Sequence, residues 1–159
     1  MDDETTILES EIRGQRMFVG EYRHNLDPKK RLTIPSQWRA QVGEPKGLYV
    51  LQDVHHKCLR VVPSRTMEPR LEKMMKVSLT DKNTREFVRA FARRADQVSW
   101  DSQGRIRIKD DLLTYADLTN EVVLVGALDS FELWNPNNLN VSGSMDEASF
   151  LNRAVSVDL

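Results

Sequence analysis

Short runs in which apolar and polar residues alternate dominate the first third of this chain, a pattern typical of half-buried β-strands. The runs at 18–26, 31–34, 47–51 and 58–62 predict four strands. Asp27-Pro28 separates the first two, because proline suits the fixed φ of a tight turn. A short helix is expected to join the second strand to the third, since proline and glycine residues mark both of its ends.

Longer helical patterns follow the fourth strand. Pro63-Ser64 predicts the start of a helix that runs to about residue 76, in which Pro69 is tolerated only near the first turn. Thr80 is expected to cap the next helix, which runs to about Arg94. Phenylalanines occupy one face of this second helix and arginines another. These residues are Phe87 and Phe91, and Arg85, Arg89 and Arg93.

The chain then repeats itself. Asp27 and its neighbours have a counterpart 74 positions later around Asp101, and an apolar run follows each copy at the same offset. A third match comes with one residue dropped. Three matches in one order indicate a duplicated fold unit, two copies of one small module rather than a solenoid of shorter repeats. The matched segments are 26–34 with 100–108, 48–51 with 122–125, and 58–63 with 131–136.

Residues from 137 onward are rich in Asn and Ser and are predicted to be mobile, with one exception. Ser144-Met145-Asp146-Glu147 has the form of a capping box. The apolar residues that follow it have helical spacing, so a short amphipathic helix that docks on another surface is expected. They are Phe150, Leu151, Ala154 and Val155.

Composition narrows the class of protein. A chain of 159 residues with 40% hydrophobic residues can bury one core or two small ones. Its apolar stretches are too short to span a membrane, and its acidic start is unlike a signal peptide. The one cysteine, Cys58, fits a reducing compartment. We therefore expect a cytoplasmic protein.

Charge is distributed unevenly along the chain, although the net charge is only −1. Residues 17–109 hold 20 Lys and Arg against 10 Asp and Glu, while residues 1–16 hold 2 against 5 and residues 110–159 hold 1 against 9. A basic block between acidic ends favours a site for a polyanion, with ends that can screen it. Ordinary solvated charge is the alternative.

Candidate catalytic or metal-binding chemistry is sparse. His55-His56-Lys57-Cys58 offers too few ligands for a metal, and adjacent residues on a strand point to opposite faces. We expect loop residues beside a buried Cys58. The chain has no nucleophile elbow, phosphate-binding glycine loop or metalloprotease helix. The sequence therefore predicts a protein without enzymatic activity, cofactor or metal.

The repeated turns carry the remaining candidates. Asp27 and Asp101 are expected to be structural, because an aspartate that opens a turn accepts hydrogen bonds from backbone N–H groups two or three residues on. The basic residues of the turns favour phosphate contact instead. A solvated face with one arginine pairing the turn aspartate is the alternative. The cations are Lys29, Lys30 and Arg31 with nearby Arg23, and Arg105, Arg107 and Lys109 in the second copy.

These motifs resemble a known family. Asp-x-Lys-x-Arg followed by an apolar pair and a proline looks like the start of an AbrB-type swapped-hairpin domain. Two copies in one chain resemble the MraZ family of bacterial DNA-binding regulators of cell-division and cell-wall gene clusters. Further motifs carry the resemblance over about 17–139. They are Met17–Tyr22, Leu79–Lys82, Val122–Gly126 and Phe131–Trp134.

The resemblance implies a mainly β fold with helices, α+β in class: a duplicated swapped-hairpin β-barrel with an inserted helical pair. The implied division is an acidic extension at 1–16, a first repeat with its following helix at 17–79, a linker helix with the second repeat at 80–140, and a mobile tail at 141–159. Residues 1–16 lie before the usual family start. The family turn usually has glycine at the position of Lys30, as the second copy has at Gly104.

The resemblance also implies a function and a site. Double-stranded DNA with repeated promoter boxes would be bound by a ring of subunits in the nucleoid, without a small-molecule substrate or membrane partner. The implied contacts are Arg31, Lys29 and Lys30, with Arg105 second and Arg23 beside them. The alternative is an antitoxin-like module that binds another protein through its acidic C-terminal part.

Overall fold

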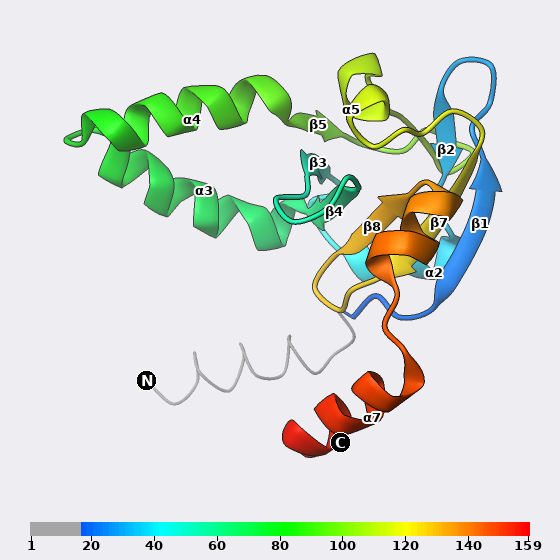
Figure 1. The fold of residues 1–159 in the computed structure, drawn as a ribbon. Coiled ribbons are helices and arrows are strands. Elements are labelled where there is room, and N and C mark those ends of the chain that lie inside the picture. The colour runs from blue at the N-terminus through cyan, green and yellow to red at the C-terminus, as the bar shows by residue number, and fades with distance from the viewer. Residues whose placement is uncertain (1–16) are drawn as a thin grey trace.

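The computed structural model describes residues 17–159, so the predicted acidic extension at 1–16 lies outside the described residues. The two copies have the same order of elements: strand, strand, short helix, strand, strand (Figure 1). The first copy consists of β1 (Glu21–Asn25), β2 (Arg31–Thr33), α2 (Ser36–Val42), β3 (Leu48–Gln52) and β4 (Leu59–Pro63). The second consists of β5 (Asp96–Val98), β6 (Arg105–Arg107), α5 (Asp110–Tyr115), β7 (Glu121–Gly126) and β8 (Phe131–Trp134).

Strands of the two copies share one sheet and one ribbon rather than forming separate sheets. A six-stranded sheet has the order β1-β7-β8-β4-β3-β5, and β2 and β6 form a two-stranded ribbon. Each copy thus places its first strand against the third strand of the other. The predicted α+β class with duplicated, swapped hairpins is confirmed.

The strand register obeys an approximate two-fold symmetry. His24 pairs with Val122, and Leu48 pairs with Val98. Adding 74 to His24 gives Val98, and subtracting 74 from Val122 gives Leu48, so the two pairs are equivalent. In the ribbon Leu32 pairs with Ile106, its own equivalent. The symmetry axis therefore passes beside this pair, and the sequence offset corresponds to a rotation that exchanges the two copies.

The largest of three hydrophobic clusters in the described residues lies between the sheet and the ribbon. Leu32 and Ile106 of the ribbon are completely buried in it, together with residues of the sheet such as Val50 and Leu124. An aromatic group closes one end: Trp38 of α2 packs on Phe131, with ring centroids 4.8 Å apart. Because both copies line the same core, neither can bury its apolar face alone.

The start of the first strand differs from the prediction. Strand pairing in β1 begins at Glu21 rather than at residue 18. Gly20 has a φ of +94°, which turns the chain just before the strand. Phe18 forms an isolated bridge with Leu128 instead. The alternation of apolar residues correctly predicted that Phe18 is buried. It did not predict the bend at Gly20 that separates Phe18 from β1.

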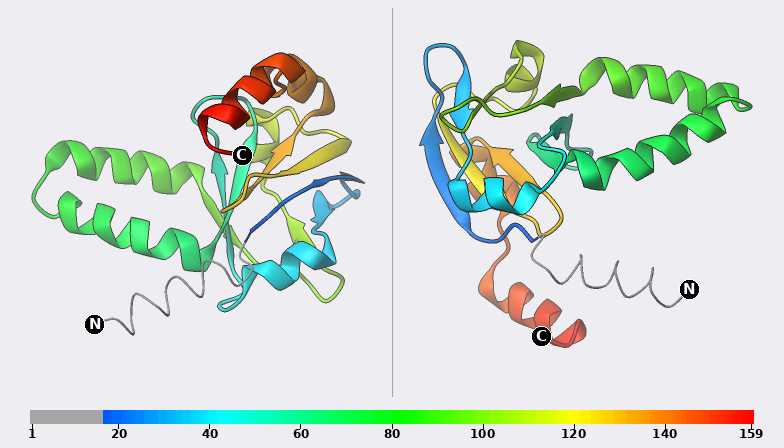
Figure 2. Two further views of the ribbon diagram at one scale, coloured as in Figure 1. Left: turned by 90° about the horizontal axis from the view of Figure 1, so that it is seen from below. Right: turned by 180° about the vertical axis from the view of Figure 1, so that it is seen from behind.

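Helices α3 (Ser64–Ser78) and α4 (Lys82–Arg94) pair and project from the barrel as an arm (Figure 1, Figure 2). The expected first-turn position of Pro69 is wrong, since it lies in the second turn. Pro69 is exposed, so water can replace the backbone donor that it lacks. The predicted cap is also wrong by one residue: Asp81, not Thr80, accepts from the backbone N–H of Thr84.

Three helical segments follow β8: α6 (Pro136–Asn138), the π-helix η1 (Leu139–Gly143) and α7 (Glu147–Ser156). The expected amphipathic helix is present as α7. Its N-cap is Asp146, which accepts from the backbone N–H of Ser149, and not the predicted Ser144. None of the helices in residues 17–159 is long and apolar enough to cross a membrane.

The two turns that precede β2 and β6 have the same backbone but different residues at one position. Lys30 has a φ of +63° and Gly104 a φ of +78°. Lysine is strained in this left-handed region, whereas glycine is not. A Cβ atom at Gly104 would also lie 2.6 Å from Cζ of Arg39, so the end of that flexible side chain would have to move. The residue equivalent to Arg39 in the second copy, 74 positions later, is Leu113 and not an arginine.

We predict that Lys30→Gly raises the free energy of unfolding by up to about 1–2 kcal/mol, the cost of a left-handed side-chain-bearing residue. Chemical denaturation and thermal melts would measure the change. Gly104→Ala is the matched control and should be destabilising, because it adds both the strain and the clash with Arg39. A lower melting temperature for Lys30→Gly would show that Lys30 is not strained.

Candidate nucleic-acid interface

The turn before β2 is organised by the carboxylate of Asp27. Its Oδ1 accepts from the backbone N–H groups of Lys29 at 2.9 Å and Arg31 at 2.8 Å. Its Oδ2 accepts from Nε of Arg31 at 2.6 Å. Backbone bonds close the same loop, since Lys30 N–H donates to Asp27 O and Asp27 N–H to Arg31 O. One carboxylate thus fixes both the backbone and the arginine.

The turn before β6 repeats this arrangement. Oδ1 of Asp101 accepts from the backbone N–H groups of Gln103 and Arg105, and Oδ2 accepts from Nε of Arg105 at 3.0 Å. Gly104 N–H donates to Asp101 O. The expected bonds from each turn aspartate to backbone N–H groups are therefore present in both copies, and in both an arginine pairs with the aspartate.

One further contact joins the two turns. Nη1 of Arg105 lies 3.7 Å from Oδ2 of Asp27, so Arg105 lies between the aspartates of both copies. Asp27 in turn lies between Arg31 and Arg105. The four side chains form a network of alternating charge with no net charge, the turn network. Each is between 23% and 36% exposed, which leaves it less screened than an open surface pair.

Both aspartates of the turn network have depressed pKa values. Partial burial alone would raise the pKa of Asp27, but hydrogen bonds from the backbone and side chain of Arg31, with the charge of Arg31, hold it below the ordinary value. The backbone hydrogen bond from Arg105 is the main cause of the lowered pKa of Asp101, and it outweighs the opposing effect of burial. Both carboxylates are therefore charged in the native state at neutral pH.

Three other cations gather at one end of the ribbon. Lys29, Lys30 and Arg107 are exposed, and none of them has an ion-pair partner within 4 Å among residues 17–159. Arg107 is opposite Arg31 in the strand register, and Lys30 O accepts from Ile108 N–H. These residues form the ribbon cation group. Sequence reasoning gave Arg107 little weight, because only the pairing of β2 with β6 brings it beside the first turn.

The other predicted cations are engaged. Arg23 donates to Glu121 on the neighbouring strand β7 at 3.0 Å. Lys109 donates through Nζ to Ala95 O at 3.0 Å, at the end of α4. The second turn has Gln103 at the position equivalent to Lys29, and its neighbouring cation is Arg39 of α2, whose guanidinium lies beside Gly104. The ribbon cation group is therefore the part of the predicted site that has charge free to meet phosphates.

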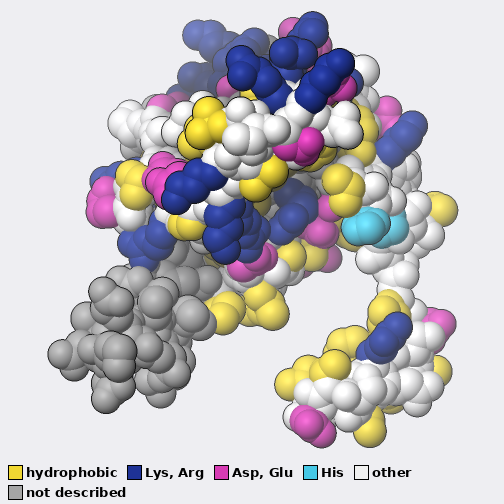
Figure 3. All heavy atoms as spheres, turned by 90° about the vertical axis from the view of Figure 1, so that its left-hand side faces the viewer, with side chains coloured by type: hydrophobic (Ala, Val, Ile, Leu, Met, Phe, Trp, Pro, Cys, Tyr) yellow, Lys and Arg dark blue, Asp and Glu magenta, His cyan; other side chains and the backbone are white. Residues whose placement is uncertain are grey.

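A second concentration of positive charge lies on the arm. Figure 3 shows Lys and Arg side chains gathered over its upper side. Arginines of α4 recur with helical spacing at Arg85, Arg89 and Arg93, all of them exposed. Helix α4 places its phenylalanines on a different face, as predicted, with the rings of Phe87 and Phe91 stacked at 6.3 Å. A polyanion could meet either surface on charge alone.

The region around Cys58 confirms the expectation of loop residues beside a buried cysteine. Residues 54–57 form a loop rather than a strand, and Cys58 is fully buried. The groups beside its thiol are Asp53 and Glu132, whose ligand atoms with Sγ all lie within 4.8 Å of one another. Neither histidine belongs to this cluster. Burial, followed by the charges of Glu132 and Asp53, raises the pKa of the Cys58 thiol.

Protein groups explain both carboxylates of this cluster. Asp53 accepts from the backbone N–H groups of His55 and His56 at 2.9 and 2.8 Å, which closes the loop. Glu132 accepts from Nε1 of Trp134 at 2.9 Å. A neutral, buried thiol is a poor nucleophile and a poor metal ligand. The cluster therefore serves the packing between β4 and β8.

Fold and site together define a class of protein: a duplicated swapped-hairpin barrel with a cationic turn. A family model described as "MraZ protein, putative antitoxin-like" matches residues 17–90 and 91–153. Transcriptional regulator MraZ of Clostridium tetani is 37% identical over 119 residues, 75% of this chain and 82% of that protein. The protein of the same name from Halothermothrix orenii is 39% identical over 119 residues, 75% of this chain and 81% of its own length.

The chain belongs to the MraZ family. The resemblance drawn from the two turns and the linker motifs is thereby confirmed. The matched segments include both turns, both barrel copies and the arm.

We predict that the turn network makes stability fall in acid. A carboxylate with a depressed pKa stabilises the native state above the unfolded value of about 3.9 and loses this effect as the pH falls through its native pKa. Asp27→Asn should therefore be less stable than the wild type near pH 7, and the difference should shrink below pH 4. Urea unfolding across this range would measure it.

Glu44→Gln is the matched control, since Glu44 is exposed and its carboxylate has no ion pair within residues 17–159. It should leave the pH dependence of stability nearly unchanged. A difference between Asp27→Asn and wild type that stayed constant from pH 7 to pH 3 would contradict the assignment.

Proposed function

We propose that this chain is a DNA-binding transcriptional regulator without enzymatic activity, which binds repeated DNA boxes as a ring-shaped homo-oligomer. Its targets would be promoters of a bacterial cell-division and cell-wall gene cluster, in the nucleoid. The observation that carries this proposal is the ribbon cation group, three exposed cations on the first turn and on β6 that have no ion-pair partner among residues 17–159. The names of the relatives as transcriptional regulators support the same role.

Each subunit would contribute a small number of contacts. Lys29, Lys30 and Arg107 would neutralise phosphates, which gives affinity without sequence preference. The tip of the second turn carries Gln103, an exposed residue whose side chain is suited to reading adenine edges. In the antiparallel ribbon Lys30 lies opposite Ile108 and Gly104 lies opposite Ile34. Lys30 and Gly104 are therefore roughly 13 Å apart along the ribbon, the length of the strand from residue 30 to residue 34. One subunit could thus place both turns on one DNA duplex.

A ring would multiply this weak site. Repeated boxes spaced to match neighbouring subunits would be held at once, since the first contact raises the effective concentration of the next. The hydrogen bonds and ion pairs of the structure suggest other roles for the arginines than the resemblance implies. Arg31 and Arg105 would hold the turns in shape, with their remaining guanidinium N–H groups available to DNA. Arg23 would contribute least, because Glu21 and Glu121 both lie within 4 Å of it.

An antitoxin-like protein-binding role is the second candidate. The description of the family model and the acidic 110–159 segment favour it. A gel-shift assay on the DNA upstream of the gene for this chain separates the two. Binding that persists at physiological salt favours the regulator, and its absence favours a protein partner.

We predict that Lys29→Gln with Lys30→Gln weakens DNA binding and flattens its salt dependence. Each lost phosphate contact should reduce the slope of log affinity against log salt by about 0.9. The paired control is Lys46→Gln with Lys57→Gln, which removes two exposed lysines from other loops. Wild-type affinity and slope in the first variant would contradict the assignment of the first turn.

Arg31→Ala should abolish or greatly weaken DNA binding. Because Arg31 also donates a hydrogen bond to Asp27, its loss could weaken the fold as well as the DNA contact. The folding of the variant must therefore be measured together with its DNA binding. Circular dichroism and melting of the same sample would show whether the barrel is intact. Full DNA affinity in a folded Arg31→Ala protein would remove Arg31 from the site.

A further inference from the structure

Helix α7 has an apolar face without a partner among residues 17–159. None of its ten residues is buried, and Phe150, Leu151 and Val155 are 57%, 53% and 75% exposed. Together with Ala154 they occupy one side of the helix. Isolated helices shorter than about 12–15 residues are marginal in water, so a helix of this length depends on packing of its apolar face.

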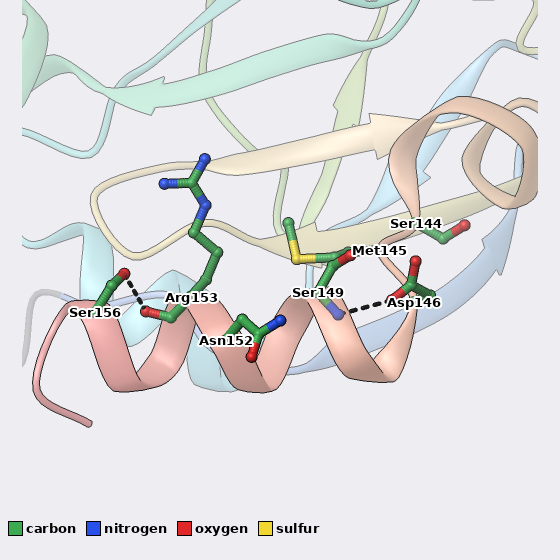
Figure 4. Close-up of a pocket in the computed structure, with 7 residues that line it drawn as sticks. All are labelled: Ser144, Met145, Asp146, Ser149, Asn152, Arg153 and Ser156. Carbon is green, nitrogen blue, oxygen red and sulfur yellow. Dashed lines mark hydrogen bonds between the residues drawn. The ribbon is translucent and has the colours of Figure 1, made fainter.

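The side of α7 that lines a hollow is the opposite, polar one. This hollow of about 670 Å³ is lined by residues of α7 and of the segment just before it (Figure 4). Residues of the barrel are absent from its lining among the described residues, and so are the four apolar residues of α7. Figure 1 shows α7 set apart from the barrel at the end of a linker. The lining residues are Ser144, Met145, Asp146, Ser149, Asn152, Arg153 and Ser156.

A groove elsewhere on the molecule offers the complementary surface. It lies between α4 and the end of β3, has a volume of about 590 Å³, and is largely apolar. Phe87 and Phe91 form one wall, with Leu51 and Met74 beside them. Phe87 is 58% exposed, an unusual state for a phenylalanine on a surface arm. The arm groove, as we call it, has the apolar lining that a helix face needs.

Charge favours α7 as the occupant. Arg60 and Arg94 line the arm groove with one acid, Asp53, and Arg60 also lies 3.8 Å from Asp129. The adjoining side of α4 holds Arg89 and Arg93 with the acids Glu86 and Asp111, so cations outnumber acids in both linings. Residues 146–158 carry Asp146, Glu147 and Asp158 against one cation, Arg153. An acidic helix with an apolar face would thus meet an apolar groove with a basic rim, the usual anatomy of a helix-in-groove contact.

We propose that α7 of one copy of this chain docks into the arm groove of a second copy, with Phe150 and Leu151 against Phe87 and Phe91. Figure 1 and both views of Figure 2 place α7 away from α4 of its own chain. Two different surfaces then meet, and such a head-to-tail contact forms a closed ring when its rotation closes. The inference rests on the homo-oligomer of the proposed function and gives it a contact.

Cross-linking between copies tests this contact without DNA. Cys58 is the one native cysteine and is fully buried, so engineered thiols would be the reactive ones. Ala90→Cys places a thiol in the arm groove and Leu151→Cys places one on the apolar face of α7. Equal amounts of the two variants, mixed and mildly oxidised, should give a reducible dimer with one chain of each kind.

Asn152→Cys is the matched control on the polar side of α7, and mixing it with Ala90→Cys should lose the linked dimer. Neither variant alone should cross-link. A chain carrying both Ala90→Cys and Leu151→Cys should form covalent multimers. Links only within one chain, equal linking by Asn152→Cys, or no link at all would overturn the proposal.

Assembly size gives a second readout. Phe87→Asp should lower the mass measured by light scattering, whereas Leu128→Asp should not, although Leu128 is 57% exposed and Phe87 58%. If the wild type were a monomer across micromolar concentrations, both this inference and the proposed ring would be overturned. DNA binding by Lys29 and Lys30 would be unaffected by that result, because the salt titration tests it separately. Equal loss of mass in both variants would also count against the arm groove.

Discussion

Antiparallel pairing of β2 with β6 is the constraint on which the rest of the structure depends. This ribbon buries Leu32 against Ile106 at the symmetry axis and carries the turn network on its flank. The swapped pairs of β1 with β7 and β3 with β5 follow from the same two-fold arrangement. Because no strand of the large sheet finds all its partners in its own copy, the two copies fold as one barrel.

The turn network sets which cations remain for function. Arg31 and Arg105 are both held by aspartates, so the charges most prominent in the repeated motif are balanced within the protein. Truncating Arg105 would leave the partly buried carboxylate of Asp101 without its arginine, whereas truncating Arg31 would leave Asp27 with the more distant Arg105. Positive charge at the first turn is left on Lys29, Lys30 and Arg107. The second turn carries no lysine at its tip, and the cation beside it is the half-buried Arg39 of α2.

Periodicity and repetition made most of the fold predictable from the sequence. The offset of 74 residues was sufficient to expect equal turns at Asp27 and Asp101, and the resemblance supplied the swapped barrel. Local signals were weaker at the ends of elements, since the bend at Gly20 and the cap at Asp81 depend on single backbone angles and hydrogen bonds. Residue type alone does not distinguish Thr80 from Asp81 as a cap.

The candidate site could be predicted only in part, for a physical reason. Sequence shows which cations share a turn, but not which of them an aspartate engages, and it cannot show that Arg105 reaches the aspartate of the other copy. The place of Arg107 beside the first turn depends on strand register, which is a tertiary property. The cluster of Cys58 with Asp53 and Glu132 was missed for the same reason, since β4 and β8 bring it together.

Lysine footprinting in the presence and absence of operator DNA would show whether the first turn, whose Lys29 and Lys30 lie outside the turn network, contacts DNA. Acetylation of each exposed lysine, read by mass spectrometry, would report protection residue by residue. We expect protection of Lys29 and Lys30, with Lys46 and Lys57 unchanged. Protection of Lys73, Lys76 and Lys82 on the arm, with Lys29 and Lys30 still reactive, would contradict this expectation.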